Sequence, residues 1–187
     1  MKSIIILKCL LVLLFIYQTD VLTQDKEYSL NELAGSSNAI VLGKVTKINS
    51  WVGGNGRIYS DVKFHVSKVY KGKMKQNQEL NFSLLGGSMG NRRTTVFEFP
   101  HFTADVESIL FLRSINDNYD VTNALVTIGG AQGKFDIIEK NNIRNVSRDE
   151  LMSATLIVKN GSEYKKINNK ETVLQSEFVS QLESLIK

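Results

Sequence analysis

The segment Trp51–Gly72 reads WVGGNGRIYSDVKFHVSKVYKG and carries the clearest local signal in the chain. Its run Gly53–Gly56 has the composition of a turn, because glycine and asparagine accept backbone conformations that other residues avoid. After the turn, polar and apolar side chains alternate along residues 58–68, with Val62, Phe64 and Val66 on the apolar side. This period of two residues is typical of a strand with one buried face. The segment therefore predicts a β-hairpin.

Further strands are predicted on both sides of this hairpin. Ala39–Ile48 alternates in the same way, and Gly43 in its middle predicts a bend or bulge of the kind that coils strands into small barrels. Leu80–Leu84, the apolar run Glu107–Arg113 and Gly133–Glu139 follow. Because turns rather than crossover helices join these strands, we predict a mainly β fold, a small antiparallel β-barrel.

We assign the barrel to residues 24–140 and expect a short helix near each of its ends. Ser29 and Glu32 stand three residues apart as a capping box, which predicts a short helix that ends near Gly35.

Residues 141–187 are predicted to be a helical C-terminal extension packed on the barrel. Ser147 and Glu150 form a second capping box before Leu151, and apolar side chains at three- and four-residue spacings predict an amphipathic helix over Gln175–Ile186.

The first 23 residues have the pattern of a secretory signal peptide. A positive start precedes an apolar run from Ile4 to Tyr17, which is shorter than the ~20 residues of a membrane-spanning helix. The alternative is an uncleaved N-terminal anchor. Cleavage before Gln24 removes Cys9, the one cysteine in the sequence. We therefore expect a secreted, periplasmic or envelope-located chain without a disulfide, a cysteine metal ligand or a transmembrane segment in its mature part.

The glycine-rich segment Leu84–Phe99 reads LLGGSMGNRRTTVFEF and has two interpretations. A phosphate-binding loop needs a helix N-terminus directly after its glycines, because the helix supplies N–H groups aimed at the anion. The residues that follow have β character, Pro100 comes soon after, and the lysine of a P-loop is missing. We therefore predict a wide turn between strands.

The order of several segments resembles a group of uncharacterised secreted bacterial proteins with an OB-like barrel. AIVLGKV precedes the hairpin strand, and a glycine-rich loop, an aromatic segment, ESILFL and GKF follow it. The matching positions are Val66, Val69, Lys71, Gly72, Phe102, Glu107, Leu110, Phe111, Leu112, Gly133, Lys134 and Phe135. Val106 stands where the family pattern has glycine. The resemblance covers roughly Ser29 to Phe135 and implies an OB-like antiparallel barrel.

More remotely, the arrangement is similar to the barrel of the tissue inhibitors of metalloproteinases. Those proteins use an N-terminal cysteine against the protease zinc and are braced by disulfides. The predicted mature chain has no cysteine. The similarity therefore implies a fold and does not imply that inhibitory mechanism.

No catalytic site, metal site or cofactor is predicted. His65 and His101 are the two histidines, and neither belongs to a motif such as H-E-x-x-H that would supply the further ligands that zinc needs. Gly86–Gly90 reads GGSMG and has the letters of the G-x-S-x-G elbow of serine hydrolases, but it lacks the strand–turn–helix setting that the elbow needs. The acidic residues are too scattered to single out a glycosidase pair.

Aromatic and basic side chains near the predicted loops are the candidates for binding, because these residue types dominate interface hot spots. Trp51 is expected at an exposed loop tip, and Tyr59 on the outward face of the next strand. The alternative for the phenylalanines is that they cover a barrel opening. The candidate ligand-binding residues are Trp51, Arg57, Tyr59, Arg92, Arg93, Phe97, Phe99, His101 and Phe102.

These patterns favour a non-catalytic binding module that recognises a protein or a glycan through barrel loops. Two alternatives stay open, a protease inhibitor that acts through a loop or the N-terminal edge, and a small hydrolase with an unrecognised site. The net charge of +4 comes from charges of both signs spread along the chain, which disfavours nucleic acid as a partner. We expect a monomer.

Overall fold

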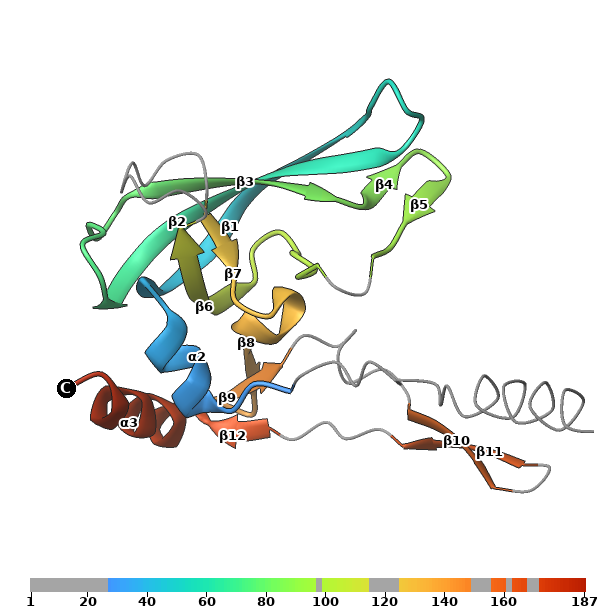
Figure 1. Ribbon diagram of the computed structural model, residues 1–187. Coiled ribbons are helices and arrows are strands. Elements are labelled where there is room, and N and C mark those ends of the chain that lie inside the picture. Colours follow the sequence, from blue (N-terminus) through green and yellow to red (C-terminus); the bar gives the residue numbers. More distant parts are fainter. Residues whose placement is uncertain (1–26, 97–98, 115–124, 149–155, 161–162, 168–171) are drawn as a thin grey trace, which may run out of the picture.

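The computed structural model describes residues 27–96, 99–114, 125–148, 156–160, 163–167 and 172–187. The predicted signal peptide, residues 1–23, lies outside the described residues. The described fold is mainly β, with antiparallel strand pairs and two helices (Figure 1). Within these ranges, no helix is long and apolar enough to cross a membrane.

One sheet forms the body of the protein, in the strand order β12-β9-β8-β6-β1-β2-β3, with β7 beside β6. Its strands are β1 (Ala39–Val52), β2 (Ile58–Lys71), β3 (Glu79–Leu85), β6 (Glu107–Ser114), β7 (Leu125–Thr127), β8 (Lys134–Lys140), β9 (Ile143–Arg148) and β12 (Thr172–Leu174). The pairings among the described residues do not join β3 to β8 or β12. The sheet is therefore open, and its hydrogen bonds do not close the predicted barrel.

Two small hairpins form two-stranded sheets of their own and do not pair with the main sheet. Two helices and one 3-10 turn complete the described fold. The hairpins are β4 (Gly87–Met89) with β5 (Arg92–Thr94) and β10 (Leu156–Asn160) with β11 (Glu163–Ile167). The helical elements are α2 (Leu30–Ser36), η1 (Gly130–Gly133) and α3 (Gln175–Leu185). In Figure 1, α2 and α3 lie below one end of the sheet, and the β1–β2 ribbon extends from it toward the upper right.

The structure confirms the local signals that combine a cap or a turn with a clear period. Ser29 and Glu32 form the predicted capping box of α2. The turn Gly53–Gly56 joins β1 and β2 as a hairpin, and β2 buries every second residue from Ile58 to Val66. The glycine-rich segment forms the β4–β5 hairpin, so the wide turn is confirmed in place of a phosphate loop.

The structure has a strand where the second capping box was predicted, whereas the helix expected over Leu151 lies outside the described residues. Ser147 and Arg148 lie in β9 rather than at a helix N-terminus. The reason is a tight turn at Asn141 and Asn142, which both have positive φ and return the chain from β8 into an antiparallel partner strand. Val146 then packs into the core from β9. Residues 141–187 thus contribute the strands β9, β10, β11 and β12 as well as α3.

The strand pair β1–β6 carries apolar side chains on both faces, because each face of the sheet covers a separate core. Ile40 and Leu42 of β1 face the first core, which also contains Phe111 of β6 and Leu182 of α3. Ala39, Val41 and Val45 of β1 face the second core. That core contains Ala39, Val41, Val45, Val62, Phe64, Val66, Leu80, Phe82, Phe102, Leu110 and Leu112.

A register shift in β1 changes which side chains face the second core. Val45 pairs with Phe64, whereas Lys47 pairs with Lys63, so Thr46 is an extra residue in β1. A strand with one extra residue sends all later side chains to the opposite face. Ile48 therefore packs on the same core as Val45, although simple alternation along the sequence predicts opposite faces.

Helix α3 attaches to the first core through Phe178 and Leu182, and we predict that truncating Leu182 destabilises the fold strongly. Leu182 is fully buried, whereas Leu185 on the same helix is 38% exposed. Leu182→Ala should lower the free energy of unfolding by about 2–5 kcal/mol, through lost burial and the cavity left behind. Leu185→Ala, measured beside it by urea denaturation, should cost less than about 1 kcal/mol. Equal costs would contradict the assignment of Leu182 to the core.

We predict that the folded protein loses stability at alkaline pH because of the partly buried hydroxyl of Tyr70. Burial raises the pKa of its hydroxyl above 10.0, and the negative charges of Glu183 and Glu107 act in the same direction. The folded state therefore holds this proton more tightly than the unfolded state does. The resulting stabilisation is complete below pH 10 and is lost as the pH rises through the pKa of the folded state.

Thermal unfolding between pH 9 and 11.5 tests this prediction with Tyr70→Phe as the comparison. The variant should show a smaller decline in melting temperature across this range, because it has no phenolic proton to lose. Equal slopes in the two proteins would contradict it.

Candidate functional site

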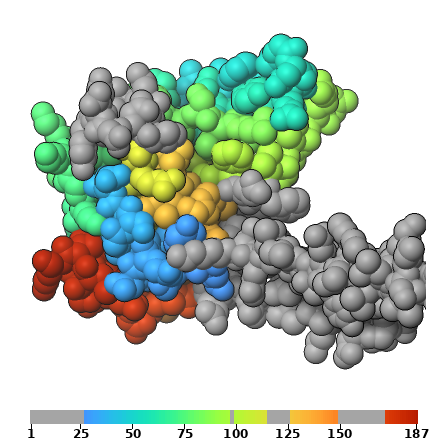
Figure 2. Space-filling view, viewed as in Figure 1, coloured from blue at the N-terminus to red at the C-terminus, as the bar shows by residue number. Residues whose placement is uncertain are grey.

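Three of the candidate residues, Trp51, Arg57 and Tyr59, lie at the far end of the β1–β2 ribbon, beyond the last residue of β1 that pairs with β6. Lys44 is that residue, and β1 continues from there to Val52 with β2 beside it. The β4–β5 hairpin lies against the ribbon end (Figure 2). Arg92 of β5 also donates a hydrogen bond to the carbonyl oxygen of Gly56 in the ribbon turn, at 3.2 Å. The ribbon end is thus supported at its tip.

On the outer face of this ribbon, three apolar side chains form one cross-strand row. Trp51 pairs with Tyr59, and Tyr59 pairs with Leu85 of β3. The indole of Trp51 stacks on the Tyr59 ring with 4.9 Å between centroids and 20° between planes. Leu85 also borders the opposite face of the ribbon, so we call the two stacked residues Trp51 and Tyr59 the aromatic row.

Local contacts hold the Tyr59 ring in place. Its hydroxyl accepts a hydrogen bond from the Asn55 side-chain amide at 2.9 Å. A Cβ on Gly53 would stand 2.7 Å from the ring, so the glycine allows Tyr59 to lie close to the backbone. Trp51 is 40% exposed. The row therefore presents a fixed aromatic surface to solvent.

The next row on the outer face is polar. Asn49 pairs with Asp61, and Asp61 pairs with Ser83. The Ser83 hydroxyl donates to the Asp61 carboxylate at 2.7 Å, and all three side chains are exposed. An apolar row beside a polar row gives this face both a stacking surface and hydrogen-bonding groups.

On the inner face of the ribbon lies a cleft of about 570 Å³, a volume within the range of small-molecule sites. Its walls come from β1, β2, β3, the β4–β5 hairpin and the segment up to Ala104. The described lining residues are Ile48, Ser50, Ser60, Val62, Leu84, Leu85, Gly86, Gly87, Ser88, Met89, Gly90, Thr94, Thr95, Val96, Phe99, Pro100, His101, Phe102, Thr103 and Ala104. The aromatic rings of Trp51 and Tyr59 are not among them.

A chain of hydroxyl groups crosses one wall of the cleft. The Ser60 hydroxyl donates to the Gly86 carbonyl oxygen at 2.8 Å, and Ser50 Oγ lies 2.9 Å from Ser60 Oγ. A serine hydroxyl has one proton. Because Ser60 uses its proton on Gly86, Ser50 must be the donor to Ser60. Ser50 therefore presents an oxygen with acceptor capacity toward the cleft.

At the mouth of the cleft, a basic pair stands beside the lining. Arg93 Nη2 lies 3.2 Å from His101 Nε2. A guanidinium only donates, so Nε2 of His101 is the acceptor in this contact. Among the described lining residues, no side chain is acidic. Arg93 therefore brings a positive charge next to the described lining.

The structure brings some of the predicted residues together and separates others. Trp51 lies in β1 rather than in a loop, but it is exposed beside Tyr59 as expected. Phe99 and His101 line the cleft on the opposite face of the ribbon, with Arg93 at its mouth. Arg92 and Arg57 belong to the exposed tip. Phe97 lies outside the described residues.

Phe102 is a core residue that also lines the cleft, so its role as a candidate ligand-binding side chain stays a prediction. Its ring is 8% exposed and stacks on Phe82 at 5.7 Å between centroids. Lys134, itself buried and 2.6 Å from the Asp136 carboxylate, lies over the same ring at 5.5 Å. Phe102 therefore forms part of the floor of the cleft.

The sequence did not indicate the hydroxyl chain or the close packing behind it. For Ser60 the period of β2 assigns the side chain to the inner face, which was a signal in the sequence. Ser50 faces the cleft because of the extra residue at Thr46, for which the sequence has no signal. Gly87 has φ of 137°, and a Cβ there would lie 2.1 Å from Ser60 Oγ. Only glycine allows the β4–β5 hairpin to approach the ribbon this closely.

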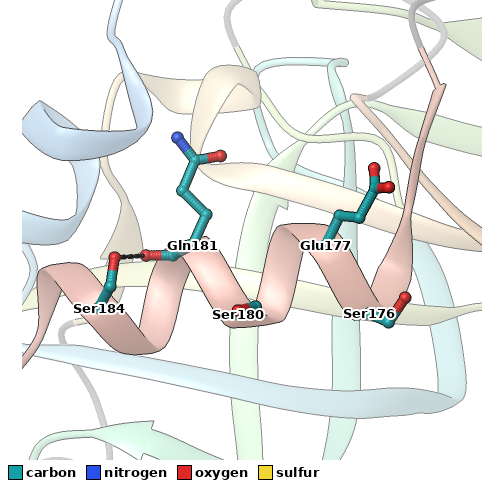
Figure 3. A pocket seen from close by; sticks show the side chains of 5 residues that line it. All are labelled: Ser176, Glu177, Ser180, Gln181 and Ser184. Carbon is teal, nitrogen blue, oxygen red and sulfur yellow. Dashed lines mark hydrogen bonds between the residues drawn. The ribbon is translucent and has the colours of Figure 1, made fainter.

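A second, shallow surface runs along the exposed side of α3 (Figure 3). Ser176, Glu177, Ser180, Gln181 and Ser184 form a polar stripe there. The Ser184 hydroxyl donates to the Gln181 carbonyl oxygen at 2.7 Å, within the helix itself. This stripe supplies no aromatic or cationic anchor for a ligand.

The two histidines do not belong to a cluster of metal-ligating side chains among the described residues. Within the ranges that the structure describes, no three His, Cys, Asp or Glu side chains cluster as metal ligands would. His65 lies half-buried on the outer face of β2, and His101 Nε2 lies 3.2 Å from Arg93 Nη2.

Comparison with known proteins found no matching family model, no matching curated protein and no matching solved structure.

We predict that Gly87→Ala disrupts the wall of the cleft. The added Cβ clashes with Ser60 Oγ and sits on a backbone conformation that L-residues rarely adopt. The variant should lose about 1–3 kcal/mol of unfolding free energy and shift the NMR signals of Ser50 and Ser60. Gly54→Ala is the matched control, because open space surrounds that position and its φ is not positive. A Gly87 variant with stability and spectrum unchanged would refute this packing.

Proposed function

We propose that this protein is a non-catalytic binding module that recognises a protein or a glycan with the outer face of its β1–β2–β3 ribbon end. We also propose that it acts outside the cytoplasm, secreted or held at the cell envelope. The signal-like residues 1–23 support that location.

The aromatic row is the observation that carries this proposal. Tryptophan, tyrosine and arginine are the residue types that contribute most to binding energy at interfaces. Here the Tyr59 ring is held by Trp51, Gly53 and Asn55. A partner that stacks on the exposed indole therefore does not have to order a flexible side chain, which lowers the entropic cost of binding.

The polar row next to it supports recognition of hydrogen-bonding partners. Asn49 and Asp61 are exposed and lie on the same face as Trp51. Sugars and protein surfaces both combine an apolar patch with hydroxyl or amide groups. The two rows match that combination in one surface.

An OB-like arrangement of the strands is part of the same proposal. The path β3-β2-β1-β6-β8 follows one curled sheet, and side chains from both halves of it meet in the second core. Leu80 and Phe82 of β3 share that core with Leu110 of β6. OB folds are partly open barrels that bind ligands across strand faces and loops.

Capture of a partner by residues 24–187 tests the proposed function. We expect the immobilised protein to retain one partner from the secreted and envelope fraction of its host, or one glycan class on a glycan array. Trp51→Ala should reduce retention at least about tenfold, because it removes a hot-spot side chain worth 2 kcal/mol or more.

Val173→Ala is the matched control for this experiment. Val173 is 43% exposed on β12, away from the ribbon end, and its variant should retain the partner fully. Retention that is equal in all three proteins, or missing from the wild type, would refute binding through the aromatic row.

A further inference from the structure

We propose that the cleft on the inner face of the ribbon is a second binding site, which takes small ligands or chain ends in which an apolar group carries a carboxylate. This site goes beyond the proposed function, because its lining excludes Trp51 and Tyr59 and faces the opposite side of the ribbon. The ligand class follows from three features of the cleft, which are its floor, its hydroxyl wall and its charge.

The floor of the cleft is apolar. Ile48, Val62, Leu84 and Phe102 line it from three strands and the segment before β6. Val62 and Phe102 belong to the second core, so this floor is fixed by core packing. An apolar group that enters the cleft removes this surface from water, which favours binding in proportion to the area covered.

The mouth of the cleft adds two exposed apolar side chains. Met89 is 47% exposed and Phe99 is 38% exposed, and both line the cleft. A flexible methionine and an aromatic ring at the rim can pack on an apolar group of variable shape. Floor and rim together thus favour a ligand with an aliphatic or aromatic body.

The positive charge of Arg93 favours a ligand that carries an anionic group. Arg93 contacts His101 with one of its guanidinium nitrogens, and the described lining offers no carboxylate to neutralise it. Arginine binds carboxylates through paired, charge-assisted hydrogen bonds. The apolar body of the ligand therefore lies on the floor, with its carboxylate directed toward Arg93.

The hydroxyl wall distinguishes two sources of this chemistry. Ser50 offers an acceptor oxygen, because its proton is used on Ser60. The C-terminal residue of a peptide brings an amide N–H that can donate to Ser50, whereas a fatty acid brings none. N-acetyl-leucine and octanoate represent the two sources as probes.

Titration of the full chain with these probes, followed by NMR and calorimetry, tests the proposal. We expect at least one probe to bind saturably and to shift signals of Ser50, Met89 and Phe99. N-acetyl-leucine amide and octanol, which lack the carboxylate, should bind at least about tenfold more weakly, the difference that one charge-assisted contact supplies.

Two neighbouring arginines provide a matched pair of variants. Arg93→Gln should weaken binding of the charged probe about tenfold and leave the uncharged probe unaffected, and Arg93→Lys should restore part of the loss. Arg92→Gln makes the same charge change on the tip, where the side chain contacts Gly56, and should leave affinity within about twofold. Both arginines are exposed, so neither change should unfold the protein.

The outcomes separate the sources and decide the proposal. Tighter binding of N-acetyl-leucine that Ser50→Ala weakens identifies a peptide C-terminus, and tighter binding of octanoate that Ser50→Ala leaves unchanged identifies a free acid. Failure of both carboxylates to bind, or equal losses in the Arg92 and Arg93 variants, would overturn the proposal. Neither result depends on Trp51, so the proposed function is judged separately.

Discussion

The pairing of Ala39–Lys44 with Glu107–Leu112 is the contact on which the rest of the structure depends. The two cores of the described fold lie on opposite faces of this ladder, with side chains of α2 and α3 in one core and side chains of β2 and β3 in the other. A strand buried on both faces has to be apolar at consecutive positions. Gly43 extends the constraint, because a Cβ there would lie 2.2 Å from the His65 carbonyl oxygen. The ladder therefore fixes both cores at once.

Features set by local chemistry could be predicted from the sequence, and features set by distant contacts could not. The capping box at Ser29 and the hairpin turn at Gly53–Gly56 involve neighbouring residues, so their signals are complete in a short segment. The same kind of signal at Ser147 was misleading, because pairing of β9 with β8 outweighs the preference for a cap. Whether a curled sheet closes depends on contacts between strands far apart in the sequence.

In the candidate site, too, features set by neighbouring residues could be predicted and features set by distant contacts could not. Exposure of Trp51 follows from its place beside a glycine turn, and its stacking on Tyr59 follows from hairpin register. The extra residue at Thr46 has no mark in the sequence, yet it decides that Ser50 faces the cleft while Trp51 faces outward. Phe102 has the composition of a surface hot spot and lies in the core, because residue type alone does not determine burial.

The ribbon end has a consequence for how this protein can change over evolutionary time. From Lys44 to Val52, β1 runs roughly 26 Å beyond its pairing with β6, at about 3.3 Å per residue. Insertions near the turn Gly53–Gly56 therefore lengthen a projection and leave both cores intact. The period of two residues restricts them, since an odd insertion in one strand exchanges the outer face with the cleft face. Descendants of this chain are expected to vary the ribbon by matched pairs of residues, and so to acquire new ligands while keeping one scaffold.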